Sequence, residues 1–168
     1  SMASKSTIMK SVINFAKGGG KVMGICNGFQ ILGEAGLLPG VLLRNKYLEF
    51  ICKNVYVKVN KTNNQYFKDL KKDIFKFHIA HNEGNYFCSK DQIKDINDND
   101  QIALFYSDQS GNVNEKSNPN GSIKNIAGIF NKEKNVLGMM PHPERMIDPA
   151  LSGQDGSIFF ENLINNLK

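Results

Sequence analysis

The run KVMGICNGFQILGEAGLLPG, residues 21–40, constrains the fold most, because it places Cys26 between Gly24 and Gly28. The pattern glycine, any residue, nucleophile, any residue, glycine is typical of an elbow at which a buried strand turns abruptly into a helix. Small residues on both sides let the strand and helix backbones approach closely, so the central side chain projects from the turn. We therefore predict a strand that ends at Cys26 and a helix over about 28–35.

Periodicity and turn residues predict the remaining elements of an α/β domain. Apolar residues at helical spacing predict a helix over 6–17, capped by Ser6 or Thr7 and ended by three glycines. A second such pattern predicts a closing helix over about 157–167. The predicted strands cover 21–26, 50–59, 74–80, 101–107, 125–130 and 135–143. The polar run 61–73 could hold a short helix, and 108–120 is predicted to be a surface loop.

Length and composition are typical of one domain. A chain of 168 residues, of which 40% are hydrophobic, can bury one sizeable core. We expect a single domain over 3–168, with Ser1 and Met2 as a remnant of processing. We find neither an apolar run of about 18 to 20 residues nor a basic segment followed by an apolar one, so we expect a cytoplasmic protein that does not associate with a membrane.

Charge and cysteine content exclude several classes of function. The net charge of +5 comes from scattered lysines rather than a basic stripe, so we expect no nucleic-acid binding, and contact with an acidic protein is a weaker alternative. The three cysteines, at 26, 52 and 88, are an odd number without metal-ligand spacing. They indicate a reducing compartment and no metal site.

The segment MMPHPER, 139–145, supplies the proton-transfer groups that a cysteine nucleophile needs. The prolines on either side of His142 favour an extended backbone, so His142 and Glu144 project from the same side. The start of the following helix favours the thiolate of Cys26. We predict a triad in which Cys26 attacks, His142 acts as acid and base, and Glu144 orients the imidazole. The alternatives are a small buried cysteine and a pair of surface residues after a strand.

Together the two motifs resemble those of the class I, triad-type glutamine amidotransferases, which carry G-x-C-x-G-x-Q and a late H-P-E. Within that family the chain is most similar to the glutaminase subunits of phosphoribosylformylglycinamidine synthases. The stretches that carry this resemblance are GICNGFQIL, LLPG at 37–40, RNK at 44–46, LEFICKNV at 48–55, AHNEGNYFC at 80–88, NIAGIF at 125–130 and NVLGMMPHPER at 135–145.

The resemblance implies an α/β, flavodoxin-like fold with a mostly parallel sheet flanked by helices and an added antiparallel portion. It also implies that the chain is truncated at its N-terminus, because the family's first strands and its P-G-G turn have no counterpart in the sequence. That turn supplies the second donor to the oxyanion. Loss of one such donor costs about 2.7 to 4 kcal/mol of transition-state stabilisation, so we expect weak or absent glutaminase activity from these 168 residues. Uncovered surface would favour self-association.

The resemblance further implies that glutamine is the substrate. Cys26 would form a glutamyl thioester, while the substrate-binding residues would be Asn27, through its backbone N–H, together with Gly28, Gln30 and His81. His81 and Glu83 fall where the family contacts the substrate's amino-acid end or its partner, with a plain strand-end loop as an equal alternative for both. Arg44 and Lys46 would lie near the partner, with a solvated loop as the alternative.

The ammonia would pass to a separate large synthetase subunit of purine biosynthesis, which would hold ATP and magnesium. No phosphate-binding loop of the form G-x-x-x-x-G-K-[ST] occurs in the sequence, and we expect no cofactor in this chain. Two alternatives stay open. One is another triad-type amidotransferase or a related cysteine hydrolase, and the other is a non-catalytic subunit that keeps the fold.

Overall fold

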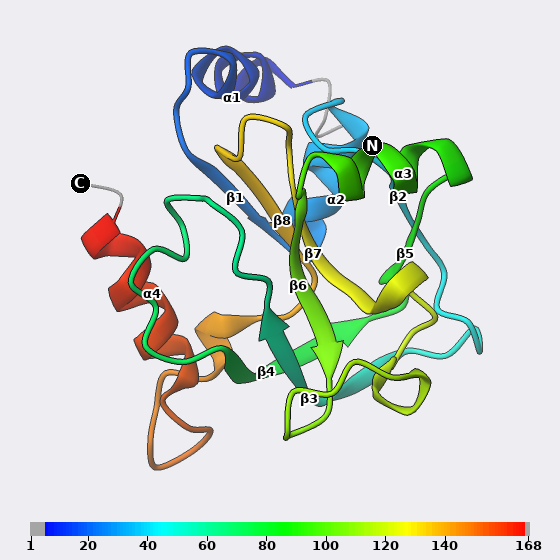
Figure 1. Ribbon diagram of the computed structural model, residues 1–168, viewed down its shortest axis with the longest axis vertical. Helices are drawn as coiled ribbons and strands as arrows, with labels where there is room; N and C mark the ends of the chain where they lie inside the picture. The colour runs from blue at the N-terminus through cyan, green and yellow to red at the C-terminus, as the bar shows by residue number, and fades with distance from the viewer. Residues whose placement is uncertain (1–5, 167–168) are drawn as a thin grey trace.

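A computed structural model describes residues 6–166, so Ser1 and Met2 lie outside the described residues. A six-stranded sheet of order β1-β8-β7-β6-β3-β4 forms its centre (Figure 1). The strands of this sheet are β1 (Val22–Ile25), β3 (Ile51–Val59), β4 (Ile74–His81), β6 (Ile102–Ser107), β7 (Ile126–Phe130) and β8 (Val136–Met139). A separate two-stranded sheet pairs β2 (Val41–Leu43) with β5 (Asn85–Phe87).

Four α-helices and three short 3₁₀ turns complete the described part of the fold. They are α1 (Thr7–Lys17), α2 (Asn27–Glu34), α3 (Lys90–Asp98) and α4 (Asp155–Asn166), with 3₁₀ turns η2 (Glu115–Ser117), η3 (Ile123–Asn125) and η4 (Pro143–Arg145). Ser6 caps α1 by accepting a hydrogen bond from the backbone N–H of Met9. The predicted helices and the six predicted strands are confirmed to within a few residues, although β8 ends at Met139 and the chain then enters η4.

The sheet was expected to be mostly parallel, but in the described residues it is mostly antiparallel. The α/β class with flanking helices and an antiparallel portion is confirmed, but within residues 6–166 only β1 and β8 pair in parallel. The other four pairings of the main sheet are antiparallel. Neighbours such as β7 and β8 follow each other through a short turn, and a turn of that kind reverses the chain, whereas a parallel pair needs a long crossover.

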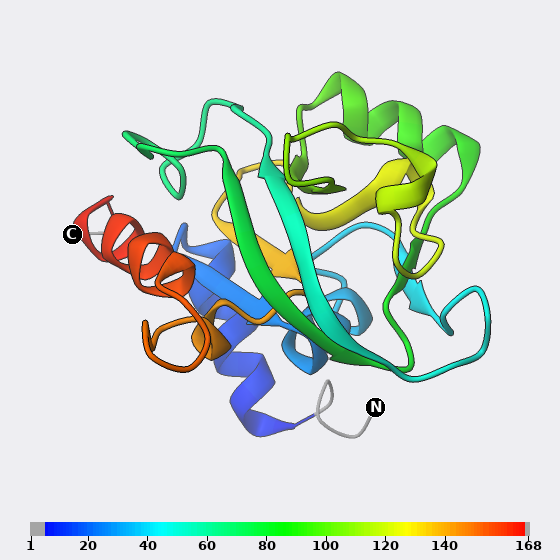
Figure 2. The ribbon, with the colours of Figure 1, turned by 90° about the horizontal axis from the view of Figure 1, so that it is seen from below.

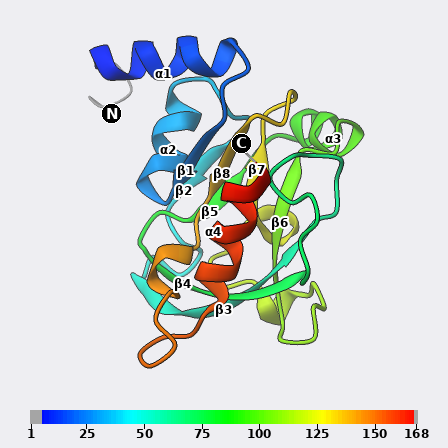
Figure 3. The same ribbon diagram turned by 90° about the vertical axis from the view of Figure 1, so that its left-hand side faces the viewer.

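Two apolar cores lie on opposite faces of the sheet. On one face α4 packs over the strands, where Phe159 contacts Phe75 and Phe77 of β4 edge to face (Figure 3). On the other face α1, α2 and α3 share a second core, to which Met9, Phe29 and Ile96 contribute (Figure 2). The strong twist of β3 and β4 relative to β1 brings the end of β4 against the carboxyl end of β1 (Figure 2).

One helix and two short strands were not predicted, and the short helix considered for 61–73 does not form. The sequence interpretation missed α3, although Ser89 and Gln92 form a capping box at its start, and it missed the short strands β2 and β5. The polar run 61–73 forms no helix. Instead it buries Tyr66, whose hydroxyl hydrogen-bonds to the backbone carbonyls of Val22 and Asn135 and so ties this run to the amino-terminal ends of both strands of the parallel pair.

None of the helices within residues 6–166 combines the length and the apolar character that crossing a membrane requires.

Candidate active site

Cys26 sits at the junction of β1 and α2 with φ 53° and ψ −106°, a conformation that non-glycine residues rarely adopt. The turn is held from the β8 side, where the backbone N–H of Cys26 donates to the carbonyl of Met139 at 2.8 Å. A Cβ atom on Gly24 would lie 2.6 Å from the carbonyl carbon of Gly28, so the close approach of strand and helix requires a glycine there. A Cβ on Gly28 would meet no atom within 4 Å, so the predicted packing role holds for Gly24 alone.

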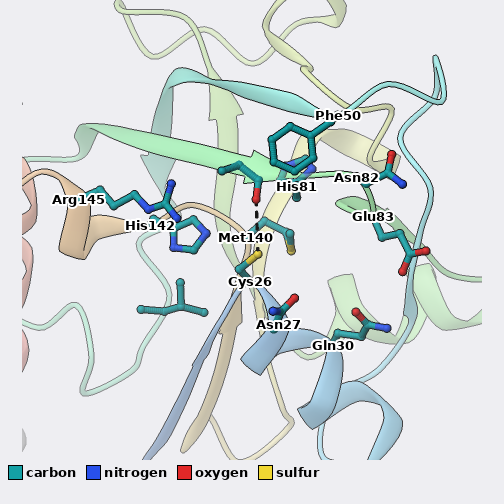
Figure 4. Close-up of a pocket in the computed structure, with 12 residues that line it drawn as sticks. Cys26, Asn27, Gln30, Phe50, His81, Asn82, Glu83, Met140, His142 and Arg145 are labelled. Carbon is teal, nitrogen blue, oxygen red and sulfur yellow. Dashed lines mark hydrogen bonds between the residues drawn. The ribbon is translucent and has the colours of Figure 1, made fainter.

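The thiol opens onto a cavity of about 530 Å³ at the carboxyl ends of β1 and β4 (Figure 4). Its walls are Ile25, Cys26, Asn27, Gln30, Phe50, Ala80, His81, Asn82, Glu83, Met140, His142 and Arg145. Of the predicted site residues, Cys26, Asn27, Gln30, His81 and His142 therefore meet in one place. Gly28 does not line the cavity, and Glu144 reaches it only through His142.

His142 is oriented from two directions. Its Nδ1 lies 2.5 Å from Oε1 of Glu144, and its backbone N–H donates to the carbonyl of His78 at 2.7 Å, which fixes the segment to the free edge of β4. Because Nδ1 carries the proton toward the carboxylate, Nε2 is left with a lone pair. Nε2 is buried and has no hydrogen-bond partner in the described part of the chain. It is the atom that can exchange a proton with a reactant in the cavity.

The surroundings of Cys26 do not favour its thiolate as the sequence predicted. Burial raises the pKa of the thiol. The backbone N–H of Asn27 and the charge of Arg145 act in the opposite direction, but they do not outweigh burial, and Glu144 adds to the rise. The Sγ atom lies 4.0 Å from the carbonyl oxygen of Ala80. Cys26 therefore rests as a thiol that needs a base, and the imidazole of His142 lines the same cavity (Figure 4).

A buried asparagine, Asn45, fixes the wall of the cavity that His81 forms. Asn45 is 1% exposed, and its Nδ2 donates to the carbonyls of Glu49 at 2.8 Å and His81 at 2.9 Å. Its Oδ1 accepts from the backbone N–H of Gly84 at 3.0 Å and from Nδ1 of His81 at 3.1 Å. These partners set the orientation of the amide, so Nδ1 of His81 must carry the proton.

His81 thereby offers an unprotonated Nε2 to the cavity. The ring is 4% exposed, and Nε2 has no hydrogen-bond partner among residues 6–166. Gly84 leaves space for the ring, because a Cβ there would lie 2.2 Å from Cε1 of His81. An unsatisfied acceptor in a buried position is costly unless a ligand satisfies it. Nε2 of His81 is therefore placed to receive a hydrogen bond from a donor on a bound molecule.

The stability of the fold is expected to fall in acid because His81 is kept neutral. Burial, reinforced by the charge of His142, lowers the pKa of His81 to about 4, from its ordinary value of 6.5. Below pH 6.5 the unfolded chain binds this proton and the folded chain does not, so the contribution is complete above pH 6.5 and is lost as the pH falls toward 4. The expected loss in the free energy of unfolding between pH 7 and pH 4.5 is about 2 to 2.5 kcal/mol. Urea unfolding at pH 7 and pH 4.5 measures it, and His81→Gln should show a smaller difference between the two. An equal difference in both proteins would contradict the assignment.

Sequence reasoning gave no role to two residues that line the cavity, Phe50 and Arg145. Phe50 is 64% exposed at the rim, and Arg145 lies beside His142 on the side away from Gln30 and Glu83 (Figure 4). The signal for Arg145 was its place directly after Glu144 in the H-P-E-R segment. Phe50 lies in the stretch LEFICKNV that carries the family resemblance, but no motif gave it a role at the site.

Of the remaining candidates, Gln30 and Glu83 line the cavity, whereas Arg44 and Lys46 do not. The Gln30 side chain donates to Oε1 of Glu34 at 3.1 Å, which leaves its carbonyl oxygen available to a ligand. Arg44 and Lys46 are exposed and outside the cavity, and the ammonium group of Lys46 lies over the ring of Tyr47, 5.6 Å from its centre. Glu83 lines the cavity at its open side.

Comparison with known proteins gives independent evidence on the family of this chain. Residues 1–154 match the model of the CobB/CobQ-like glutamine amidotransferase domain. The chain is 83% identical to a phosphoribosylformylglycinamidine synthase subunit PurQ of Pelagibacter ubique over 168 residues, which are 100% of this chain and 74% of that protein. It is 45% identical to the PurQ subunit of Salinibacter ruber over 163 residues, 96% of this chain and 69% of that protein.

Solved structures agree with these relatives. A chain in the structure of PurLQS from Thermotoga maritima superposes with a TM-score of 0.82 at 35% identity, covering 99% of this chain and 71% of that chain. A glutamine amidotransferase from Thermotoga maritima shares the fold, with a TM-score of 0.56 at 14% identity over 94% of this chain and 66% of that chain.

Proposed function

The chain belongs to the CobB/CobQ-like glutamine amidotransferase family, and we propose that it hydrolyses glutamine to supply ammonia to a phosphoribosylformylglycinamidine synthase in purine biosynthesis. One observation carries the chemical part of this proposal. The strained elbow aims Cys26 into the cavity where His142, held by Glu144, presents an unpartnered Nε2. A nucleophile, a base and an orienting carboxylate are what acyl transfer from an amide requires.

In the first half of the proposed reaction, Nε2 of His142 takes the thiol proton of Cys26 while Sγ attacks the side-chain amide carbon of glutamine. The backbone N–H of Asn27 follows the nucleophile at the helix start and supports the developing negative charge on oxygen. His142 then gives the proton to the departing nitrogen, and ammonia leaves behind a glutamyl thioester. Glu144 stabilises the imidazolium that exists between these two transfers.

In the second half, His142 acts as a base again and takes a proton from water, which attacks the thioester. The carbon–sulfur bond breaks, glutamate forms and Cys26 recovers its proton through Nε2. The substrate's amino-acid end would extend from Cys26 toward Gln30 and Nε2 of His81, since both offer acceptors on that side of the cavity. This direction keeps the amide at the elbow and leaves Arg145 beside the triad.

The proposed function also suggests a partner subunit, a cellular compartment and a state of assembly for this chain. A large synthetase subunit would hold ATP, magnesium and the acceptor nucleotide, and Arg44 and Lys46 are our candidates for its contact surface. A reducing cytoplasm suits the three free cysteines. Self-association stays a prediction: β1 is an edge strand of the sheet within residues 6–166, and Ile8 and Phe15 of α1 are exposed.

Transfer of nitrogen from glutamine tests the function. The chain is mixed with a synthetase subunit, ATP, magnesium, formylglycinamide ribonucleotide and either glutamine or an ammonium salt, and amidine formation is followed. We expect glutamine to support the reaction, Cys26→Ala to abolish it, and the ammonium salt to restore it with that variant. With the chain alone we expect little ammonia from glutamine, because the sequence contains no P-G-G turn to provide a second oxyanion donor.

The other outcomes distinguish the alternatives. Ammonia release that depends on Cys26 but gives no amidine with any cognate synthetase would favour another amidotransferase or cysteine hydrolase. Amidine formation unaffected by Cys26→Ala would favour a non-catalytic subunit. Fast ammonia release by the chain alone, lost in Cys26→Ala, would contradict the expected weak activity.

A further inference from the structure

A second cysteine, histidine and asparagine meet on the outer face of β3 and β4, outside the cavity. Cys52 and Asn54 are two residues apart on β3, and His78 of β4 lies directly opposite Asn54. Because side chains alternate between the faces of a strand, all three project from the same face. The cavity beside Cys26 is not lined by any of them, and the proposed glutamine chemistry does not use them.

Their hydrogen bonds form a relay. Sγ of Cys52 lies 3.4 Å from Nε2 of His78, and Nδ1 of His78 lies 3.0 Å from Oδ1 of Asn54. With the amide oxygen as acceptor, Nδ1 carries the proton and Nε2 keeps a lone pair that faces the thiol. Cys52 is exposed, so a molecule in solution can reach its sulfur. The geometry is that of a thiol poised to give its proton to a base as it attacks.

Burial and the surrounding positive charges keep the imidazole of His78 neutral. Burial lowers the pKa of His78 from its ordinary value of 6.5, and the charges of Arg145 and His142 act in the same direction. The other titratable groups on this face of the strands are Tyr56 and Lys58 of β3 and Lys76 of β4, while Glu144 of η4 and Asp155 of α4 lie on the elements that contact β4. Glu144 is engaged by His142, and Asp155 by the backbone N–H of Lys76 and by Lys72. At neutral pH the imidazole is therefore free to accept a proton.

We propose that Cys52 is a second nucleophilic thiol, with His78 as its base and Asn54 as the group that orients the base, and that small carboxylate-bearing disulfides modify it. In this step Nε2 of His78 takes the thiol proton while Sγ attacks one sulfur of the disulfide. A new sulfur–sulfur bond forms as the old one breaks, and the departing thiolate takes the proton from His78. The exchange is balanced without an added oxidant. Lys76, on the same face and four residues along β4 from Ala80, the residue opposite Cys52, favours the approach of a reagent with carboxylates.

The modified residue, Cys52, lies opposite the β4 residue that contacts the catalytic elbow. Cys52 is paired with Ala80, the residue whose carbonyl oxygen faces Sγ of Cys26, and the carbonyl of His78 holds the backbone of His142. A group attached to Cys52 would therefore sit on the back of the segment that contacts both proposed catalytic residues.

Thiol exchange kinetics test this proposal independently of glutamine chemistry. In Cys26→Ser, the remaining thiols are Cys52 and the buried Cys88. We expect dithiobis(nitrobenzoate), which bears two carboxylates, to modify Cys52 first, as located by peptide mass mapping. His78→Gln is expected to slow this reaction by about tenfold or more, and Asn54→Ala by a smaller factor. Tyr56→Phe, a change on the same face outside the relay, should leave the rate unaltered. For each reagent, the rate with Cys52 is divided by the rate with a free small thiol. This ratio should be smaller for neutral dithiodipyridine than for the anionic reagent.

The pH profile separates a base from a structural role. With His78 present, the rate should stay level from neutral pH down to the pKa of His78, which burial holds below 6.5. In His78→Gln the rate should instead fall about tenfold for each pH unit below neutral pH, because only the thiolate then reacts. The proposal is overturned if Cys52 in the folded chain reacts no faster than in the chain unfolded in urea. It is equally overturned if the rate with His78 present already falls through neutral pH as for an isolated thiol.

Discussion

His142→Gln is expected to slow the trapping of Cys26 by a chloroketone analogue of glutamine by about 10²- to 10⁴-fold at neutral pH. Burial raises the pKa of the Cys26 thiol, so little thiolate forms there without a base, and Nε2 of His142 is the unpartnered base that faces the cavity. Alkylation forms a single bond and needs no second oxyanion donor, so it reports on the thiol and its base directly. The measurement is the rate at which the adduct on Cys26 appears by mass spectrometry.

The pH dependence of the same reaction distinguishes a base from a scaffold. Because hydroxide can replace the missing base, the defect of His142→Gln should shrink as the pH rises toward and beyond the pKa of the thiol. Glu144→Gln keeps an acceptor for Nδ1 without the charge, so a smaller defect is expected. Cys52→Ser serves as a control and should leave the adduct on Cys26 forming at an unchanged rate. A defect of His142→Gln that is equally large at every pH would contradict the assigned role.

The parts of the site that lie in one short segment could be predicted from the sequence. The elbow at Cys26 and the pair of His142 and Glu144 each depend on residues within two positions of one another, so spacing alone conveys their geometry. The helix starts were predictable for the same reason, and α3 would have been, since Ser89 and Gln92 are three apart.

Features that depend on distant segments could not be predicted. Whether a helix start lowers the pKa of a thiol depends on how much solvent the fold removes, and at Cys26 burial prevails. Likewise, the run around Tyr66 is polar in sequence, yet the hydroxyl finds carbonyls 44 and 69 residues away and becomes buried. The wall built on Asn45 and His81, 36 residues apart, carries no local pattern at all.

Asn45→Ala is expected to lower the free energy of unfolding by about 3 kcal/mol or more, the second large effect that the structure predicts. The substitution removes all four hydrogen bonds of a side chain that is 1% exposed. It leaves the N–H of Gly84, Nδ1 of His81 and two carbonyls without these partners, and each unsatisfied buried group costs about 1 to 3 kcal/mol. Urea unfolding at pH 7 measures the change, with exposed Asn54→Ala as a matched control for which about 0.5 kcal/mol or less is expected.

A double-mutant cycle ties this loss to the cavity wall. If Asn45 acts by fixing His81, then Asn45→Ala and His81→Gln together should destabilise less than the sum of the two single changes, by about 0.5 to 3 kcal/mol. The same coupling should weaken glutamine binding, since freeing the ring of His81 leaves its Nε2 no longer fixed toward the substrate. Strict additivity in stability would mean that Asn45 holds the backbone around Gly84 and Glu49 but does not set the orientation of the imidazole.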